Sequence, residues 1–140
     1  MKIIQKEILL KARPRGFHLI TKEITDQLKD LSEIRKGIAN IFIKHTSASI
    51  SINENADPTV RQDMEKYFNE SVPEDAGYYL HTFEGTDDMT SHIKSSIIGS
   101  NVNIPVTNGT FNLGTWQGIY LCEHRNNGGS RKIVVTVYGE

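Results

Sequence analysis

Residues 81–99 read HTFEGTDDMTSHIKSSIIG, and this stretch predicts a helix that carries several titratable side chains. Asp87 and Asp88 can each accept a hydrogen bond from the unpaired amides of a first helical turn. Gly99 adopts a positive φ without strain, as the end of a helix often requires. The helical spacing of four further positions predicts the face that packs inward: Met89, Ile93, Ser96 and Ile97.

The same helix brings a carboxylate beside an imidazole. Asp88 precedes His92 by four residues, so one helical turn separates them. A carboxylate in this position can hold one imidazole nitrogen and leave the other for a metal ion or a proton. His81 lies just before the helix, where a short loop can bring it towards His92. Two interpretations stay open: a local hydrogen bond beside helix-capping acids, or a functional site.

Composition limits the classes of protein that fit. A chain of 140 residues predicts one domain, spanning residues 1–140. There are 16 Lys and Arg against 17 Asp and Glu, so we expect neither a nucleic-acid partner nor a membrane partner. Strand-sized apolar runs and the lack of a signal-peptide pattern predict a cytoplasmic protein. Cys122 is the one cysteine, and we expect it to be a buried structural thiol.

Most of the remaining chain predicts strands. Residues 133–138, IVVTVY, are the most β-prone segment and predict a central strand. Asn108-Gly109 predicts a hairpin turn, because both positions accept a positive φ. Helices are expected from Thr21 and after Asp57, where Pro58 suits the first helical position. Further strands are predicted at 3–12, 17–20, 38–45, 50–53, 101–106 and 119–124. The sum is an α+β fold with antiparallel sheets covered by about three helices.

A small, hydroxyl-rich turn follows the strand that His45 ends, and residues 45–49 read HTSAS. One interpretation is a strand junction with local bonds from side chains to the backbone. The other is a turn that presents hydroxyls and amides to an anion beside His45. Three residues supply the hydroxyls in that second case: Thr46, Ser47 and Ser49.

Glu123 ends an apolar row, because Ile119 and Leu121 share its face of a strand. A carboxylate there needs a partner such as a metal ion, an Arg or a substrate cation. His124 and Arg125 are expected at the surface or in a turn.

The recognised phosphate-binding, nucleophile and zinc motifs are absent: there is no Walker loop, GxGxxG, HExxH, CxxC or GxSxG. Three histidines remain, each at the end of an element or on an inward face: His45, His81 and His92. Imidazoles beside carboxylates suit zinc or a similar metal ion.

Three segments carry a resemblance to a known family: KHTSASISINENADPTVRQDM, HTFEGTDDMTSHIKSSIIG and IPVTNGTFNLGTWQGIYLCEHR, with RKIVVTVYGE at the end. Together they cover nearly the whole chain, which resembles the YjbQ family, also called secondary thiamine-phosphate synthase. The resemblance implies a compact α+β sandwich that assembles as a homotrimer. It also implies a divalent metal site, with zinc as the ion and His45, His81 and His92 as its ligands.

The implied reaction joins a pyrimidine carried as a pyrophosphate to a thiazole carried as a phosphate, and it releases pyrophosphate. The leaving group needs cationic or N–H stabilisation, which a metal ion, magnesium included, can supply. Asp88 or Glu123 would face the developing pyrimidine cation as the catalytic carboxylate. The candidate substrate-binding residues are Thr46, Ser47, Ser49, Trp116, Gln117 and Arg131.

Two alternatives of other classes stay open. The first is a metal-dependent hydrolase of a small phosphate or ester substrate, with Asp88 or Glu123 as the base. The second is a non-catalytic trimer that binds a metal ion or a metabolite. The number of protein ligands separates them, because three ligands leave a position for chemistry and four favour a structural site.

Overall fold

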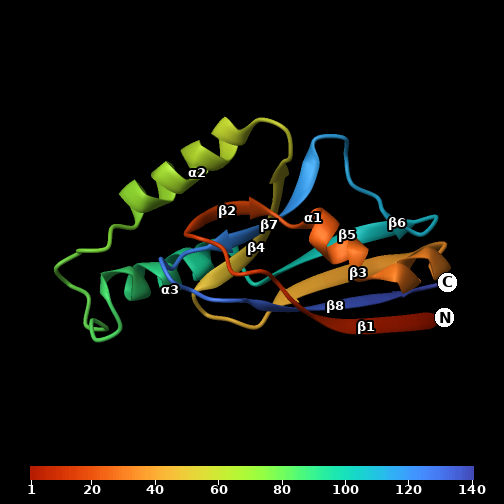
Figure 1. Ribbon diagram of the computed structural model, residues 1–140, viewed down its shortest axis with the longest axis horizontal. Coiled ribbons are helices and arrows are strands. Elements are labelled where there is room, and N and C mark those ends of the chain that lie inside the picture. The colour runs from red at the N-terminus through yellow and green to blue at the C-terminus, as the bar shows by residue number, and fades with distance from the viewer.

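Two antiparallel sheets pack against each other in the computed structural model, which describes residues 1–140 (Figure 1). The larger sheet has five strands in the order β1 (Lys2–Leu9), β8 (Lys132–Gly139), β3 (Lys36–Ile43), β5 (Asn101–Thr107) and β6 (Thr110–Phe111). The smaller sheet has three, in the order β2 (Gly16–Leu19), β7 (Gln117–Glu123) and β4 (Ala48–Glu54). The predicted α+β class with antiparallel sheets is confirmed.

The core lies between the sheets, because alternate residues of each strand point inward. Ile133, Val135 and Val137 of β8 are fully buried, and β8 pairs on one side with β1 and on the other with β3. The prediction of a central strand at 133–138 is therefore confirmed. The hairpin at Asn108-Gly109 is confirmed as well, since both residues have positive φ and join β5 to β6.

Helices cover the smaller sheet and the edge of the sandwich. Asp57 caps α2 (Pro58–Ser71) by accepting from the Thr59 amide at 2.9 Å. Met64 and Phe68 of α2 pack on the smaller sheet, over Phe17 and Tyr120. The other helices are α1 (Thr21–Asp26), the short 3-10 helix η1 (Lys29–Glu33) and α3 (Thr86–Ile98). No helix has the length and apolar character needed to cross a bilayer.

The prediction for the inward face of α3 is wrong. Ile97 is 59% exposed and Ser96 is exposed too, whereas the buried positions are Asp87, Asp88, Thr90, Ser91, Lys94 and Ser95. The polar side chains can face inward because neighbouring elements supply their partners. Ser95, for example, donates to the Ala48 carbonyl at 2.7 Å. This orientation turns the acidic start of α3 towards the end of β7.

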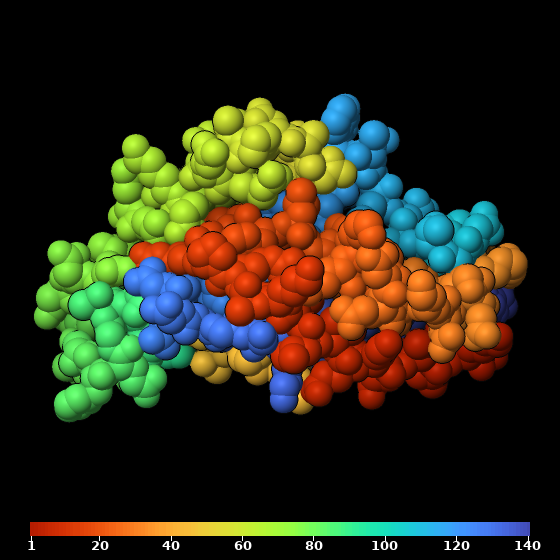
Figure 2. Space-filling view, viewed as in Figure 1, coloured from red at the N-terminus to blue at the C-terminus, as the bar shows by residue number.

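The two termini and the start of α3 lie at opposite ends of the molecule. β1 and β8 run side by side, with Lys2 paired to Gly139. The segment between α2 and α3 forms the other end, where it projects in green at the left of Figures 1 and 2. The polar residues of α3 therefore meet the ends of the strands away from both termini.

Gly37 on β3 lies opposite Gly139 on β8, and a Cβ added to Gly37 would lie 2.3 Å from the Tyr138 carbonyl oxygen. We expect Gly37→Ala to lower the free energy of unfolding by about 1–3 kcal/mol, because backbone has to move. Urea unfolding measures this change. Gly77→Ala is the control, since no atom lies within 4 Å of its added Cβ, and an equal loss there would contradict the explanation.

Candidate functional site

Two imidazoles and one carboxylate converge at the start of α3. His81 comes from the loop before the helix, and Asp88 and His92 come from its first two turns. The Nε2 of His81 lies 2.6 Å from Asp88 Oδ2, and the Nε2 of His92 lies 3.1 Å from the same oxygen. The ligand atoms of the three residues all lie within 4.8 Å of one another. We call this group the His81–Asp88–His92 cluster.

A backbone carbonyl fixes the tautomer of His92. Its Nδ1 lies 2.9 Å from the Thr46 oxygen, and because a carbonyl oxygen only accepts, Nδ1 must carry a hydrogen. In a neutral ring the lone pair is then on Nε2, which points at Asp88. A lone pair and a carboxylate oxygen repel each other at this distance unless a proton or a metal ion lies between them. The cluster is therefore built around a cation.

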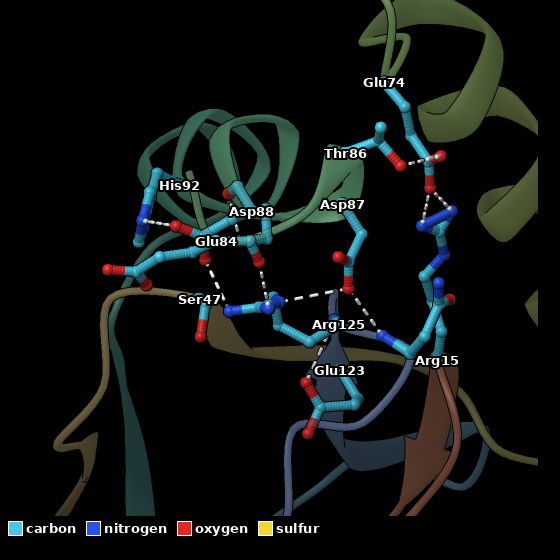
Figure 3. A network of polar contacts seen from close by, with 12 residues as sticks. Arg15, Ser47, Glu74, Glu84, Thr86, Asp87, Asp88, His92, Glu123 and Arg125 are labelled. Carbon is cyan, nitrogen blue, oxygen red and sulfur yellow. Dashed lines mark hydrogen bonds and ion pairs between the residues drawn. The ribbon is translucent and has the colours of Figure 1, made fainter. Parts of the chain in front are cut away.

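The carboxylate of Asp88 stays charged although the Asp88 side chain is 1% exposed, because His81, His92 and Arg125 all contact it. Burial alone would raise the pKa of Asp88, but the hydrogen bond from His81 and the charges of His92 and Arg125 lower it below its ordinary value. Arg125 donates to Asp88 Oδ1, which leaves Oδ2 to the imidazoles (Figure 3).

Arg125 also holds Asp87, through its Nε at 3.0 Å. Burial would raise the pKa of Asp87, and the Asn126 amide together with Arg125 lowers it instead. A further bond from Arg125 reaches the Glu84 carbonyl at 2.9 Å, so this one side chain joins the end of β7 to the start of α3 (Figure 3). The expectation that Arg125 lies at the surface or in a turn does not predict these bonds to the start of α3.

Glu123 and Arg131 form a closed ion pair beneath the site. Arg131 Nε donates to Glu123 Oε1 at 2.8 Å, and its Nη2 reaches Glu123 Oε2 and the Ser47 carbonyl. Glu123 is fully buried and Arg131 is 4% exposed. The partner that the carboxylate requires is thus an Arg. Neither side chain opens towards the cluster, so their predicted catalytic and substrate-binding roles gain no support from this geometry.

The predicted hydroxyl residues divide into buried and open ones. Ser49 is fully buried, with its Oγ 2.8 Å from His124 Nε2. His124 is 1% exposed, so the expectation that it lies at the surface is wrong, and burial lowers its pKa to about 3. Ser47 is buried as well, whereas Thr46 is exposed beside His92.

Trp116 and Gln117 lie away from the cluster. Gln117 begins β7 and Glu123 ends it, so the strand places them about 20 Å apart at its usual rise per residue. The indole of Trp116 is 64% exposed at that far end. Within one chain, the structure does not bring these two predicted substrate-binding residues to the cluster.

His45 lies outside the cluster but shares a cavity with it. Its Nε2 accepts from the Lys132 amide at 2.8 Å. Burial, followed by the charge of Arg131, lowers the pKa of His45, so the ring is neutral. An open cavity of about 610 Å³ is lined by His45, Thr46, His92, Ser95, Ser96, Gly99 and Ser100.

The cluster has a donor set that suits zinc. Two imidazole nitrogens and one carboxylate oxygen are its common catalytic ligands, and ligand atoms around a tetrahedral zinc lie roughly 3.3 Å apart. The 3.1 Å between His92 and Asp88 is close to that spacing, and the shorter distance from His81 needs only a small movement of an exposed loop. Three protein ligands leave a fourth position for a small molecule.

Comparisons with known proteins give a consistent result. A family model described as UPF0047 protein YjbQ-like matches residues 6–140. The UPF0047 protein YjbQ of Salmonella typhimurium is 54% identical over 136 residues, which are 97% of this chain and 98% of that one.

Solved structures agree. A Clostridium acetobutylicum protein, described as an uncharacterized conserved protein of the yjbq/upf0047 family, is 35% identical with a TM-score of 0.78, covering 96% of this chain and 99% of that one. A Sulfolobus solfataricus P2 structure, described as a YbjQ-like protein of unknown function, is 25% identical with a TM-score of 0.85, covering 99% of both chains.

Arg125→Leu tests the electrostatics of the site. The variant removes the guanidinium shared by two buried acids, which keep only the imidazoles at Asp88 and the Asn126 amide at Asp87, so we expect the free energy of unfolding at pH 7 to fall by about 3 kcal/mol. Folding lowers the pKa values of Asp87 and Asp88, so their ionised forms stabilise the folded protein fully at pH values above the unfolded pKa. This stabilisation is lost as the pH falls through the folded pKa values. Urea unfolding should therefore show a smaller loss at about pH 3. An equal loss at both pH values would contradict this assignment.

Proposed function

The chain belongs to the UPF0047 YjbQ-like family, and from this premise we propose an enzyme that holds a divalent metal ion and acts on a small phosphorylated substrate. His81, Asp88 and His92 are the proposed metal ligands. One observation carries the proposal: a single oxygen of Asp88 faces the Nε2 atoms of two imidazoles, and it stays charged although it is buried. Such an arrangement needs a cation, and the donor set favours zinc over magnesium.

The number of ligands supports chemistry rather than a purely structural role. Three protein ligands leave one coordination position, and the adjoining cavity gives a substrate room beside it. When bound, the metal ion would supply Lewis-acid stabilisation of phosphoryl oxygens and of a leaving pyrophosphate. Arg125 holds Asp88 ionised, and the Thr46 carbonyl orients His92. Both positions are set before a ligand arrives.

The specific reaction that we propose is the thiamine-phosphate synthase reaction implied by the family resemblance. The bond between the pyrimidine carbon and its pyrophosphate oxygen breaks, and a bond from that carbon to the thiazole nitrogen forms. In this scheme Asp88, predicted as a catalytic carboxylate, serves as a metal ligand, because its Oδ1 accepts from Arg125, its Oδ2 faces the two imidazoles and its side chain is 1% exposed. Thr46 contributes an exposed hydroxyl at the cavity, whereas Glu123 is committed to Arg131 and is not needed.

Hydrolysis of a phosphate ester is the second candidate. The same open coordination position and polar cavity support hydrolysis, because this reaction requires no acceptor other than water. A trimer that binds a metal ion or a metabolite without turnover is the third candidate. The cytoplasmic location belongs to the proposal too, supported by one buried, unpaired cysteine, Cys122.

A homotrimer is also part of the proposal. Uncovered apolar side chains support assembly: Leu80 and Phe83, close to His81 in the chain, are 95% and 100% exposed, and Ile97 near the end of α3 is 59% exposed. Aromatic and aliphatic groups without charges are typical of the core of an interface between subunits.

Metal content tests the cluster. Protein purified without a histidine tag should carry nearly one zinc per chain by mass spectrometry. His81→Ala, Asp88→Asn and His92→Ala should each lose most of it, because ligand loss lowers affinity strongly. His18→Ala is the control, since His18 Nε2 bonds to the Pro14 carbonyl and the residue is not part of the cluster. A zinc-free wild type, or a His92→Ala variant that keeps both zinc and the synthase rate, would refute the proposed metal site.

Light scattering tests the assembly. The expected mass is about three times the 15.8 kDa of one chain. Ile97→Glu places a charge at an uncovered apolar position of α3 and should shift the mass towards one chain. Lys29→Glu, at an exposed position on η1, should leave it unchanged. A wild type with the mass of one chain would exclude the trimer.

A further inference from the structure

One hydrogen bond fixes both the charge and the orientation of His45. The Lys132 amide donates to its Nε2 at 2.8 Å, and a backbone N–H has no lone pair to accept with. Nε2 therefore carries the lone pair, and the single ring hydrogen is on Nδ1. That Nδ1 has no hydrogen-bond partner in the chain, and the half-buried His45 lines the cavity. The cavity shared with His92 is lined by the same ring.

The turn after His45 offers further donors. The backbone amides of Thr46 and Ser47 make no hydrogen bond to another group of the chain. Successive free amides in a turn form a concavity that suits an anion. Of the three cations near His45, Arg131 is paired with Glu123 and Lys44 with Glu7, so Lys132 is the one that adds positive charge beside the turn. These donors and charges together suit the oxygens of a phosphate group.

A metal ligand must offer a lone pair, and the only lone pair of the His45 ring is occupied by the Lys132 amide. Binding a metal ion would break that bond, whereas donating from Nδ1 leaves it intact. The cavity wall supplies hydroxyls from Ser96 and Ser100 for the remaining atoms of a ligand.

We propose that His45 is a positioning residue that donates a hydrogen bond from neutral Nδ1–H to a phosphate oxygen of the substrate, and that it is not a metal ligand. This inference rests on the proposed function for its phosphorylated substrate. It assigns the phosphate to the side of the cavity lined by His45 and Thr46, next to His92.

Two matched variants separate the ring nitrogens. Asn reproduces the position of Nδ1 and keeps a donor there, whereas Gln reproduces Nε2 and keeps the acceptor for Lys132. Calorimetric titration with inorganic phosphate, using protein as purified and protein loaded with zinc, measures binding. We expect His45→Gln to weaken phosphate binding at least about tenfold, as for a lost hydrogen bond to a charged group, and His45→Asn to weaken it much less. Both variants should keep the zinc content of the wild type.

The outcomes are distinct. Loss of zinc from both variants would overturn the inference and make His45 a metal ligand. Equal phosphate affinity in His45→Gln and the wild type, or no phosphate binding by the wild type, would overturn it as well. A zinc-free wild type would refute the proposed metal site alone, since the phosphate titration of the same protein still compares the two variants. Circular dichroism checks that each variant is folded.

Discussion

The ion pair of Arg125 with Asp87 and Asp88 is the interaction on which the site depends. A carboxylate that is 1% exposed is costly to ionise, and the cost is offset only by a partner with good geometry. Arg125 follows β7, and its two acids open α3, so the pair attaches the helix to the end of the smaller sheet. Because both acids stay charged, the polar face of α3 can be the buried one.

A polar layer continues from this pair towards the core. The Glu123–Arg131 pair and the Ser49–His124 bond are both buried, and each group in them has a partner. With a pKa of about 3, His124 is neutral at physiological pH and adds no charge to the layer. Fully paired buried networks hold their members in one arrangement. The layer therefore gives the cluster a rigid base.

The sequence predicts the β elements well, because burial and turn chemistry are local: alternation identifies β8, and Asn108-Gly109 identifies a hairpin. The pairing of Asp88 with His92 also follows from one helical turn. The face of α3 does not, because apolar spacing assumes that polar groups stay in water. Arg125 is invisible for the same reason, since its acids lie 37 and 38 residues away and meet it only in the folded chain. The prediction that Trp116 binds substrate at the site fails within one chain, because a residue's position in the sequence does not reveal which end of the strand carries the site.

The cluster distinguishes between the two cations that could occupy it. If only protons are present, His81 must donate to Asp88 from Nε2, and His92 must carry hydrogens on both nitrogens, since Thr46 already takes the one on Nδ1. Two separate protons are then needed around one carboxylate oxygen. A single metal ion satisfies all three lone pairs at once and also permits a fourth ligand. By accepting the hydrogen on Nδ1, Thr46 therefore leaves neutral His92 with its lone pair on Nε2, which is the atom that a metal ligand would offer.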